Sequence, residues 1–154
     1  MCRIESSRLP WLAVEVKQYT VAASLDQNKS KIGSLTEEAL VRLKGQADCI
    51  LIEADGAKRL PLKVPGEWEP VIPDFTDLVV GVIGMDAVGQ MIRESCHRPE
   101  RVAAFLNKEQ TDPVTEADVI RIAVSDKALK KAVGRRPYKI FLNKTDLMGK
   151  YESA

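Results

Sequence analysis

Three apolar stretches along the chain have the length and composition of buried β-strands. They are Asp48–Ala54 (DCILIEA), Asp77–Ile83 (DLVVGVI) and Tyr138–Leu142 (YKIFL). Nearly continuous apolar runs of this kind are typical of strands that are covered on both faces, as in parallel sheets. Tyr19–Ser24 (YTVAAS) begins with residues that favour β-structure and is a fourth, shorter candidate.

Helical patterns separate these strands. Ser34 and Glu37 have capping-box spacing, Thr36 is an alternative cap, and Gly45 ends the helix that follows. Caps and first-turn residues predict further helices at 99–107, 115–124 and 127–134. Strands that alternate with helices predict an α/β fold in three layers, with a mostly parallel sheet flanked by helices.

Composition adds limits to this picture. A chain of 154 residues with 45% apolar residues fits a single domain, here 1–154, with a sizeable core. The 23 basic and 22 acidic residues nearly cancel, so the overall charge gives no reason to expect nucleic acid or an anionic membrane as a partner. No apolar run approaches the roughly 20 residues of a membrane span. Three scattered cysteines indicate a reducing compartment, so we expect a cytoplasmic protein.

The last strand runs into Asn143-Lys144-Thr145-Asp146, which resembles the guanine-reading motif of GTP-binding proteins. The ring N–H and the exocyclic amino group of guanine lie side by side, and one carboxylate can accept from both. Asp146 would then read the base, Lys144 would cover one face of it, and Asn143 would hold neighbouring loops. The alternative is an ordinary turn and cap after a strand, which needs no ligand.

The earliest of the three long apolar runs ends in an acidic segment. Glu53 and Asp55 could hold Mg²⁺ beside bound phosphates, and Gly56 would let the backbone approach them. The alternative is that Asp55-Gly56 forms an ordinary turn and that Glu53 pairs with a nearby cation. A long proline-containing loop follows at 55–76, and loops of this length are usually functional or disordered.

A phosphate-binding loop is missing from this sequence. The GxxxxGK[ST] pattern, whose backbone N–H groups wrap the β- and γ-phosphates, does not occur in the 154 residues. The Gly149-Lys150 pair lacks the upstream glycine. A single histidine, His97, excludes a histidine-rich metal site. The residues alone therefore predict no structural metal site and leave the catalytic residues unknown.

Four segments together resemble the family of selenium-dependent molybdenum hydroxylase accessory proteins, the YqeC-like family. The segments are IEADGAKRLPLKVPGEWEPVIP, DLVVGVIGMDAVG, HRPERV and FLNKTD, within about residues 31–147. The resemblance implies a P-loop NTPase-like fold, a GTP or GDP ligand with Mg²⁺, and a role in molybdenum hydroxylase maturation. Residues 1–18 match poorly the Gly-rich loop with which members begin, so we expect an N-terminally shortened fold without its first strand and P-loop.

The resemblance assigns roles to the matched positions only. The base-reading positions are Asn143, Lys144 and Asp146. The magnesium and phosphate positions are Glu53, Asp55, Gly56 and Lys58. Further signature positions are Lys63, Glu69, Asp86, His97 and Arg98. A sheet without its first strand would expose an edge, which predicts self-association or a partner protein, such as the hydroxylase maturation machinery.

Three functions compete on these grounds. The first is a guanine-nucleotide-binding accessory protein, which could be a GTPase only if another chain or upstream sequence supplies a P-loop. The second is a scaffold that has lost nucleotide hydrolysis and docks a partner enzyme or a cofactor through the loop at 55–76. The third is an enzyme with Glu53, Asp55, Lys58 and His97 as acid–base groups, for which no substrate is suggested.

Overall fold

The computed structural model describes residues 35–147, and the chain divides into two compact units, residues 1–50 and 51–154. In the first unit the described element is helix α1 (Glu37–Lys44). Thr36 caps it, because its hydroxyl accepts the Ala39 N–H at 3.3 Å, and Gly45 ends it. The alternative cap and the helix end are therefore confirmed. The predictions that concern 1–18, 19–24 and Ser34 lie outside the described residues.

The second unit contains two further predicted helices. These are α3 (Pro99–Leu106) and α4 (Glu116–Val124), and both are confirmed. Thr115 and Asp118 form a capping box at the start of α4, with the Asp118 N–H donating to the Thr115 hydroxyl at 3.3 Å. The shorter helical elements of the unit are α2 (Ile92–Ser95), η2 (Met85–Ala87) and η3 (Thr145–Leu147). Within residues 35–147, no helix has the length and apolar character that crossing a bilayer requires.

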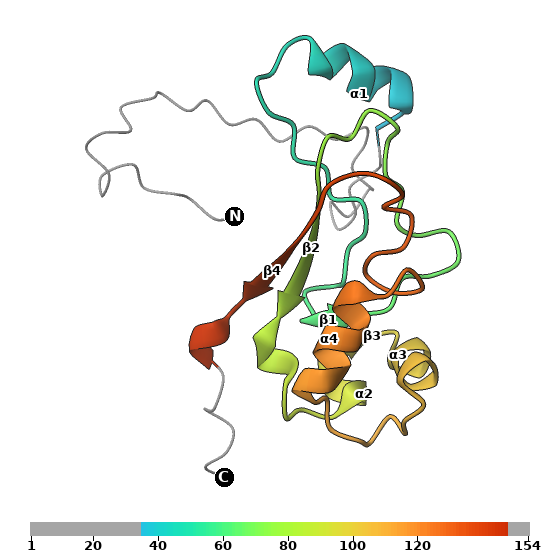
Figure 1. The fold of residues 1–154 in the computed structure, drawn as a ribbon, viewed down its shortest axis with the longest axis vertical. Coiled ribbons are helices and arrows are strands. Elements are labelled where there is room, and N and C mark those ends of the chain that lie inside the picture. The colour runs from blue at the N-terminus through green and yellow to red at the C-terminus, as the bar shows by residue number, and fades with distance from the viewer. Residues whose placement is uncertain (1–34, 148–154) are drawn as a thin grey trace, which may run out of the picture. The chain divides into compact units, whose positions relative to one another are not determined.

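Two pairs of parallel strands organise the second unit. β2 (Val79–Gly84) pairs with β4 (Tyr138–Asn143), and the short β1 (Leu62–Lys63) pairs with β3 (Cys96–His97). Figure 1 shows β2 and β4 side by side, with their carboxyl ends pointing the same way. Parallel pairing between strands that enclose helices in the sequence confirms the predicted α/β class.

Helix α4 packs against β2 and the start of β4, whereas Ile140 and Leu142 on the same face of β4 are 41% and 46% exposed. The Tyr138 hydroxyl donates to the Ala123 carbonyl at 2.9 Å, and a side chain at Gly81 would come within 2.8 Å of Leu129. A side chain at 81 would therefore have to displace the side chains of Leu129 and Tyr138. The largest fully buried side chains of the unit are Ile83, Ile92, Ile122, Val102, Val114, Val133 and Cys96.

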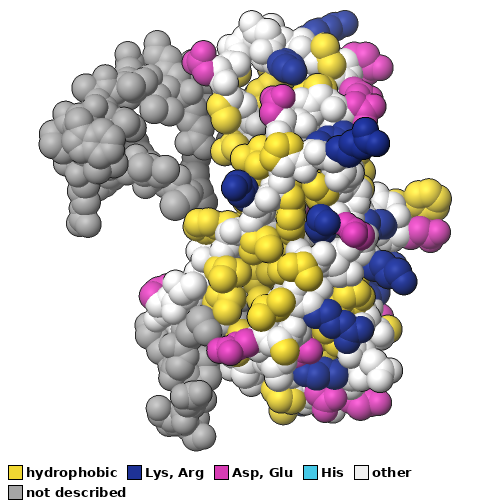
Figure 2. All heavy atoms as spheres, viewed as in Figure 1, with side chains coloured by type: hydrophobic (Ala, Val, Ile, Leu, Met, Phe, Trp, Pro, Cys, Tyr) yellow, Lys and Arg dark blue, Asp and Glu magenta, His cyan; other side chains and the backbone are white. Residues whose placement is uncertain are grey.

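The opposite face of the β2–β4 pair is apolar and exposed among the described residues. Val80 and Val82 are 48% and 55% exposed, and Phe141, which lies opposite Val82, is 56% exposed. Figure 2 shows hydrophobic side chains gathered over the region of β2 and β4. The expectation that these strands are buried on both faces is therefore wrong for the described part of the chain. Self-association, or a partner at an exposed edge of the sheet, stays a prediction.

The first predicted strand, Asp48–Ala54, is not a strand. The segment has no regular structure, and Leu51 and Ile52 are 92% and 37% exposed. One backbone contact is the Val71 N–H, which donates to the Ala54 carbonyl at 3.2 Å. Within 35–147 no neighbouring strand pairs with this segment. An apolar run needs a paired neighbour to satisfy its backbone, so composition alone does not make it a strand.

The helix predicted at 127–134 is a series of turns. The Lys131 N–H donates to the Ala128 carbonyl at 2.9 Å, a three-residue spacing that does not continue as an α-helix. Ala132 and Gly134 have left-handed backbone angles, with φ of 60° and 64°. A left-handed residue interrupts a right-handed helix, and that interruption explains why the prediction fails.

The loop at 55–76 is more ordered than predicted. It contains β1, and all residues from Leu62 to Gly66 are buried. The Gly84 N–H donates to the Pro61 carbonyl at 2.9 Å, and a side chain at Gly84 would lie 2.5 Å from Pro61. The middle of the loop is thus part of the core and runs past the carboxyl end of β2.

A fully buried valine of the core and an exposed valine of β2 predict different costs for the same substitution. Val102→Ala, at a fully buried position of α3, should lower the free energy of unfolding by roughly 2–3 kcal/mol. Val82→Ala, at 55% exposure, should cost less than about 1 kcal/mol. Urea unfolding followed by circular dichroism measures both. Equal costs would mean that another molecule or segment covers the Val82 face.

Candidate functional site

The predicted base-reading residues lie at the carboxyl ends of β2 and β4. Gly84 ends β2 directly opposite Asn143, which ends β4. The Asn143 side-chain oxygen accepts the Lys144 N–H at 2.9 Å, and Lys144 has a left-handed φ of 58°. The chain then turns into η3, which contains Asp146. This is the edge at which parallel α/β sheets bind ligands, so the position predicted for the motif is the one it occupies.

The Asp146 carboxylate is exposed. Within residues 35–147, its side chain has no hydrogen-bond or ion-pair partner. Both of its oxygens can therefore accept bonds from a ligand. The Lys144 side chain, in contrast, is engaged: its ammonium lies 2.7 Å from Oδ2 of Asp86, which follows β2.

The acidic segment is held by Lys63, whose side chain is only 6% exposed. Its ammonium donates to Oδ1 of Asp55 and to the Gly56 carbonyl, the latter at 2.9 Å. Burial raises the pKa of Asp55, and Lys63 opposes that rise. Glu53 and Lys58 are exposed, and Lys58 has a left-handed φ of 50°.

The described residues do not supply a metal cage of their own. Nowhere in 35–147 do three histidine, cysteine, aspartate or glutamate side chains gather in a way that could hold a metal. Asp55 is bonded to Lys63, so it could join a magnesium shell only if it used its other oxygen or if Lys63 released it. The magnesium role of Glu53 and Asp55 therefore stays a prediction.

Glu69 is the centre of the ion network that holds the loop. Arg98 donates to both of its carboxylate oxygens, at 2.7 and 3.0 Å, and Lys63 donates at 3.3 Å. The Gly66 N–H donates to the same carboxylate at 3.0 Å. Desolvation raises the pKa of Glu69, but the bonds from Gly66, Arg98 and Lys63 outweigh it and lower the pKa to about 2. Glu69 is thus a negatively charged anchor and not a proton donor at neutral pH.

His97 lies beside this network. β1 and β3 place it opposite Lys63, and it precedes Arg98, whose left-handed φ is 56°. Desolvation lowers the pKa of His97, and the charges of Lys63, Arg98 and Lys58 lower it further. Burial raises the pKa of the Cys96 thiol, which disfavours a thiolate–imidazolium pair between Cys96 and His97. The acid–base enzyme stays a prediction without a supporting contact.

The sequence-predicted residues thus form two groups. One consists of Asp86, Asn143, Lys144 and Asp146 at the strand ends, and the other of Asp55, Gly56, Lys63, Glu69, His97 and Arg98 in the ion network. The bond between Gly84 and Pro61 connects the two groups, because Pro61 lies two positions before Lys63. Glu53 and Lys58 project from the loop with exposed side chains.

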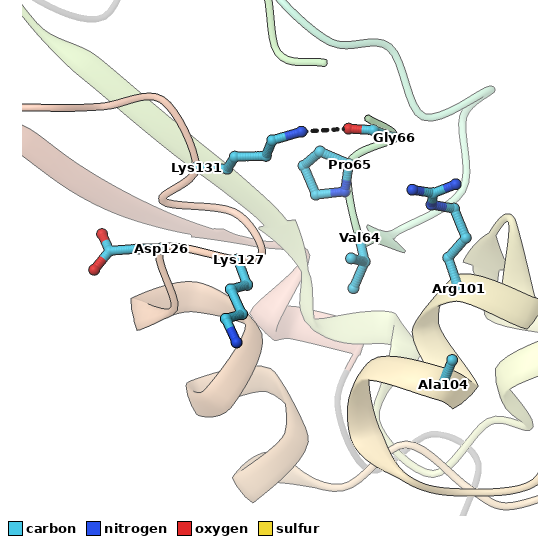
Figure 3. A pocket seen from close by; sticks show the side chains of 8 residues that line it. All are labelled: Val64, Pro65, Gly66, Arg101, Ala104, Asp126, Lys127 and Lys131. Carbon is cyan, nitrogen blue, oxygen red and sulfur yellow. Dashed lines mark hydrogen bonds between the residues drawn. The ribbon is translucent and has the colours of Figure 1, made fainter. Parts of the chain in front are cut away.

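The sequence did not reveal that a distant lysine holds the loop at 55–76. Lys131, in the segment predicted as a helix at 127–134, donates to the Gly66 and Glu67 carbonyls at 2.6 and 2.7 Å. This contact borders an open hollow of about 440 Å³, which Figure 3 shows from close by. Its lining consists of Val64, Pro65, Gly66, Arg101, Ala104, Asp126, Lys127 and Lys131. None of the predicted nucleotide positions lines it. No short motif marks a lysine that binds carbonyls 65 and 64 positions away, so no local sequence signal could have revealed it.

A model of the YqeC protein family matches residues 5–100, more than half of the chain. The chain belongs to the YqeC family. A relative from Escherichia coli (strain K12), named "Uncharacterized protein YqeC", is 40% identical over 74 residues. That alignment covers 46% of this chain and 29% of the relative, so the chain spans less than a third of the relative's length. No solved structure matches the chain.

The family match includes the ion network and ends before the base-reading residues. Lys63, Glu69 and Arg98 lie inside 5–100, whereas Asn143 and Asp146 lie outside it. Membership confirms the YqeC-like resemblance. The match begins at residue 5, upstream of the predicted start near residue 31, and does not include the FLNKTD segment. The role of the strand-end residues rests on their own geometry.

The histidine of this YqeC-family protein reports directly on its cationic surroundings. The chain has one histidine, so its NMR titration gives a single curve. We expect the pKa of His97 to lie below its ordinary value of 6.5. Lys58→Gln should raise it, because Lys58 contributes to the lowering, whereas the adjacent Arg59→Gln serves as the control. A pKa at or above 6.5 would contradict the arrangement of the ion network.

Glu69 should make the free energy of unfolding depend on pH in the acid range. Its pKa is about 2 in the folded chain against an ordinary 4.5, so its stabilising effect is complete above about pH 5 and is lost as the pH falls towards 2. Glu69→Gln should be less stable at pH 7 but lose less stability between about pH 5 and pH 3 than the unmodified chain. Urea unfolding at these pH values measures the difference. The exposed Glu67→Gln is the control, and an acid response of Glu69→Gln equal to that of the unmodified chain would disprove the anchoring role.

Proposed function

We propose that this YqeC-family chain binds a guanine nucleotide at the carboxyl ends of β2 and β4. The observation that carries the proposal is the Asp146 carboxylate, which follows a parallel strand, is exposed, and has no partner among residues 35–147. One carboxylate can accept from both the ring N–H and the amino group of guanine. Adenine lacks this donor pair and would leave Asp146 without bonds.

The surrounding residues support the same ligand. Lys144 extends its side chain between the two strand ends, where its methylene stem can cover a planar base. The Asn143 side chain accepts a hydrogen bond from the Lys144 N–H and so fixes the turn that carries Asn143 and Lys144. Lys58 and Arg59 are exposed cations on the loop whose Pro61 meets Gly84, which places positive charge in the same region for phosphates.

The wider role and architecture belong to the same proposal. We infer that β2 and β4 are part of a larger parallel sheet of the P-loop NTPase type in three layers. Among the described residues no third strand pairs with either of them, and their second face is apolar and exposed, which supports further strands and a covering layer. The accessory role in selenium-dependent molybdenum hydroxylase maturation is supported by the resemblance of the signature segments. GTP hydrolysis would additionally need a phosphate-binding loop from another chain or from upstream sequence, since these 154 residues contain no GxxxxGK[ST].

A second candidate is a docking module that works through the loop at 55–76. Trp68 is 85% exposed and Val71 is 69% exposed, although the middle of the same loop is buried. Exposed tryptophan is enriched among the residues that dominate protein–protein binding. This observation favours a partner enzyme that covers Trp68, whether or not a nucleotide also binds.

Base selectivity tests the first candidate. The full chain should bind GDP more tightly than inosine diphosphate, which lacks the amino group, by about 10- to 100-fold, the value of one hydrogen bond to a charged group. ADP should bind still more weakly. Fluorescence competition or calorimetry with each nucleotide measures the order.

Asp146→Asn provides the matched exchange. An amide offers one acceptor and one donor, which fit the ring N–H and the 2-oxo group of xanthine. The variant should therefore prefer xanthosine diphosphate to GDP, while Asp77→Asn, at another exposed aspartate, keeps the original order. Equal binding of GDP and ADP by the unmodified chain would disprove guanine recognition and leave the docking module as the better candidate.

A further inference from the structure

The ion pair between Asp86 and Lys144 joins two residues that are 58 positions apart in the chain. Asp86 follows β2 and Lys144 follows β4, and the two strands are parallel neighbours. Their charged atoms lie 2.7 Å apart, with the side chains 17% and 41% exposed. The pair therefore bridges the strand ends at the place where the proposed base would bind.

Both partners are held in place by their own backbones. Lys144 has a left-handed φ of 58°, and Asn143 fixes its N–H at 2.9 Å. Asp86 lies in η2, with Oδ1 packed over Gly84: a side chain at position 84 would come within 2.5 Å of that oxygen. Glycine at the end of β2 is thus required for the carboxylate to reach its position.

The second oxygen of Asp86 indicates that the pair is not simply stabilising. Oδ1 is buried and has no hydrogen-bond partner within the described residues. Burying an acceptor without a partner is unfavourable, and a partly exposed ion pair contributes little to stability. A group that is held at such a cost is a candidate for a functional role.

We propose that Asp86 is a positioning residue that orders Lys144 for contact with the base, an inference that rests on the proposed guanine site. Asp86 holds the ammonium at the end of β2, so the methylene stem lies across the strand ends before a ligand arrives. A free lysine would lose its rotamer freedom on binding, and ordering it beforehand removes that cost. The stem contacts any purine face, whereas Asp146 alone distinguishes the bases.

This division of roles makes Asp86→Asn different from any change at Asp146. The variant should weaken binding of GDP and of inosine diphosphate by the same factor, about threefold to tenfold, the size of effect that ordering one long side chain produces. The ratio between the two nucleotides should not change. Asp126→Asn, which breaks the 3.2 Å pair with Lys130 on an exposed turn, is the matched control and should leave both affinities unchanged.

A double-mutant cycle completes the test. Lys144→Met keeps an unbranched apolar stem but removes the ammonium, so Asp86→Asn should have no further effect in that background. Thermal unfolding of each variant checks whether it is folded. If Asp86→Asn does not fold, Lys144→Met takes its place, because it breaks the same ion pair from the other side. The positioning role is wrong if the unmodified chain prefers GDP over ADP but Asp86→Asn binds GDP as tightly as the unmodified chain does. It is also wrong if the effects of Asp86→Asn and Lys144→Met on GDP affinity are additive. If the unmodified chain shows no such preference, the guanine site itself is wrong.

Discussion

The paired hydrogen bonds between Arg98 and the Glu69 carboxylate are the interaction on which the described fold depends. They join the loop at 55–76 to the start of α3, and the same carboxylate binds Lys63 and the Gly66 N–H. A charged side chain can be buried only when it is paired, so Lys63 needs the carboxylates of Asp55 and Glu69 to enter the core. Glu69 therefore allows an irregular, proline-containing segment to pack as part of the interior.

This anchoring has a consequence at the strand ends. Because β1 is fixed beside β3, Pro61 meets Gly84 and closes one side of the edge where β2 and β4 terminate. Asp86 and Lys144 bridge the ends of the two strands. The Asp146 carboxylate is left without a partner among the described residues. Thus the family-signature residues mostly build the framework, while a small polar group at the sheet edge is available to a ligand.

Local patterns predicted helices with strong caps and strands with a neighbour. Thr115 and Gly45 marked helix ends that the structure has, and β2 and β4 formed where apolar runs occurred. The prediction failed for Asp48–Ala54, because a strand depends on a partner that its own sequence does not encode. The position of the strand-end residues could be predicted, since parallel strands end together, but the contacts of Asp86 and Lys131 could not, because they join residues distant in the chain.

We propose that a guanine nucleotide binds at the ends of β2 and β4 and not elsewhere on the chain. Backbone NMR of the full chain, titrated with GDP, tests this proposal. We predict shifted signals at Gly84, Asp86 and Asn143–Leu147, with those of Arg101 and Lys127 in the separate hollow unchanged. Shifts confined to the hollow, or none at any GDP concentration that the chain tolerates, would contradict the account.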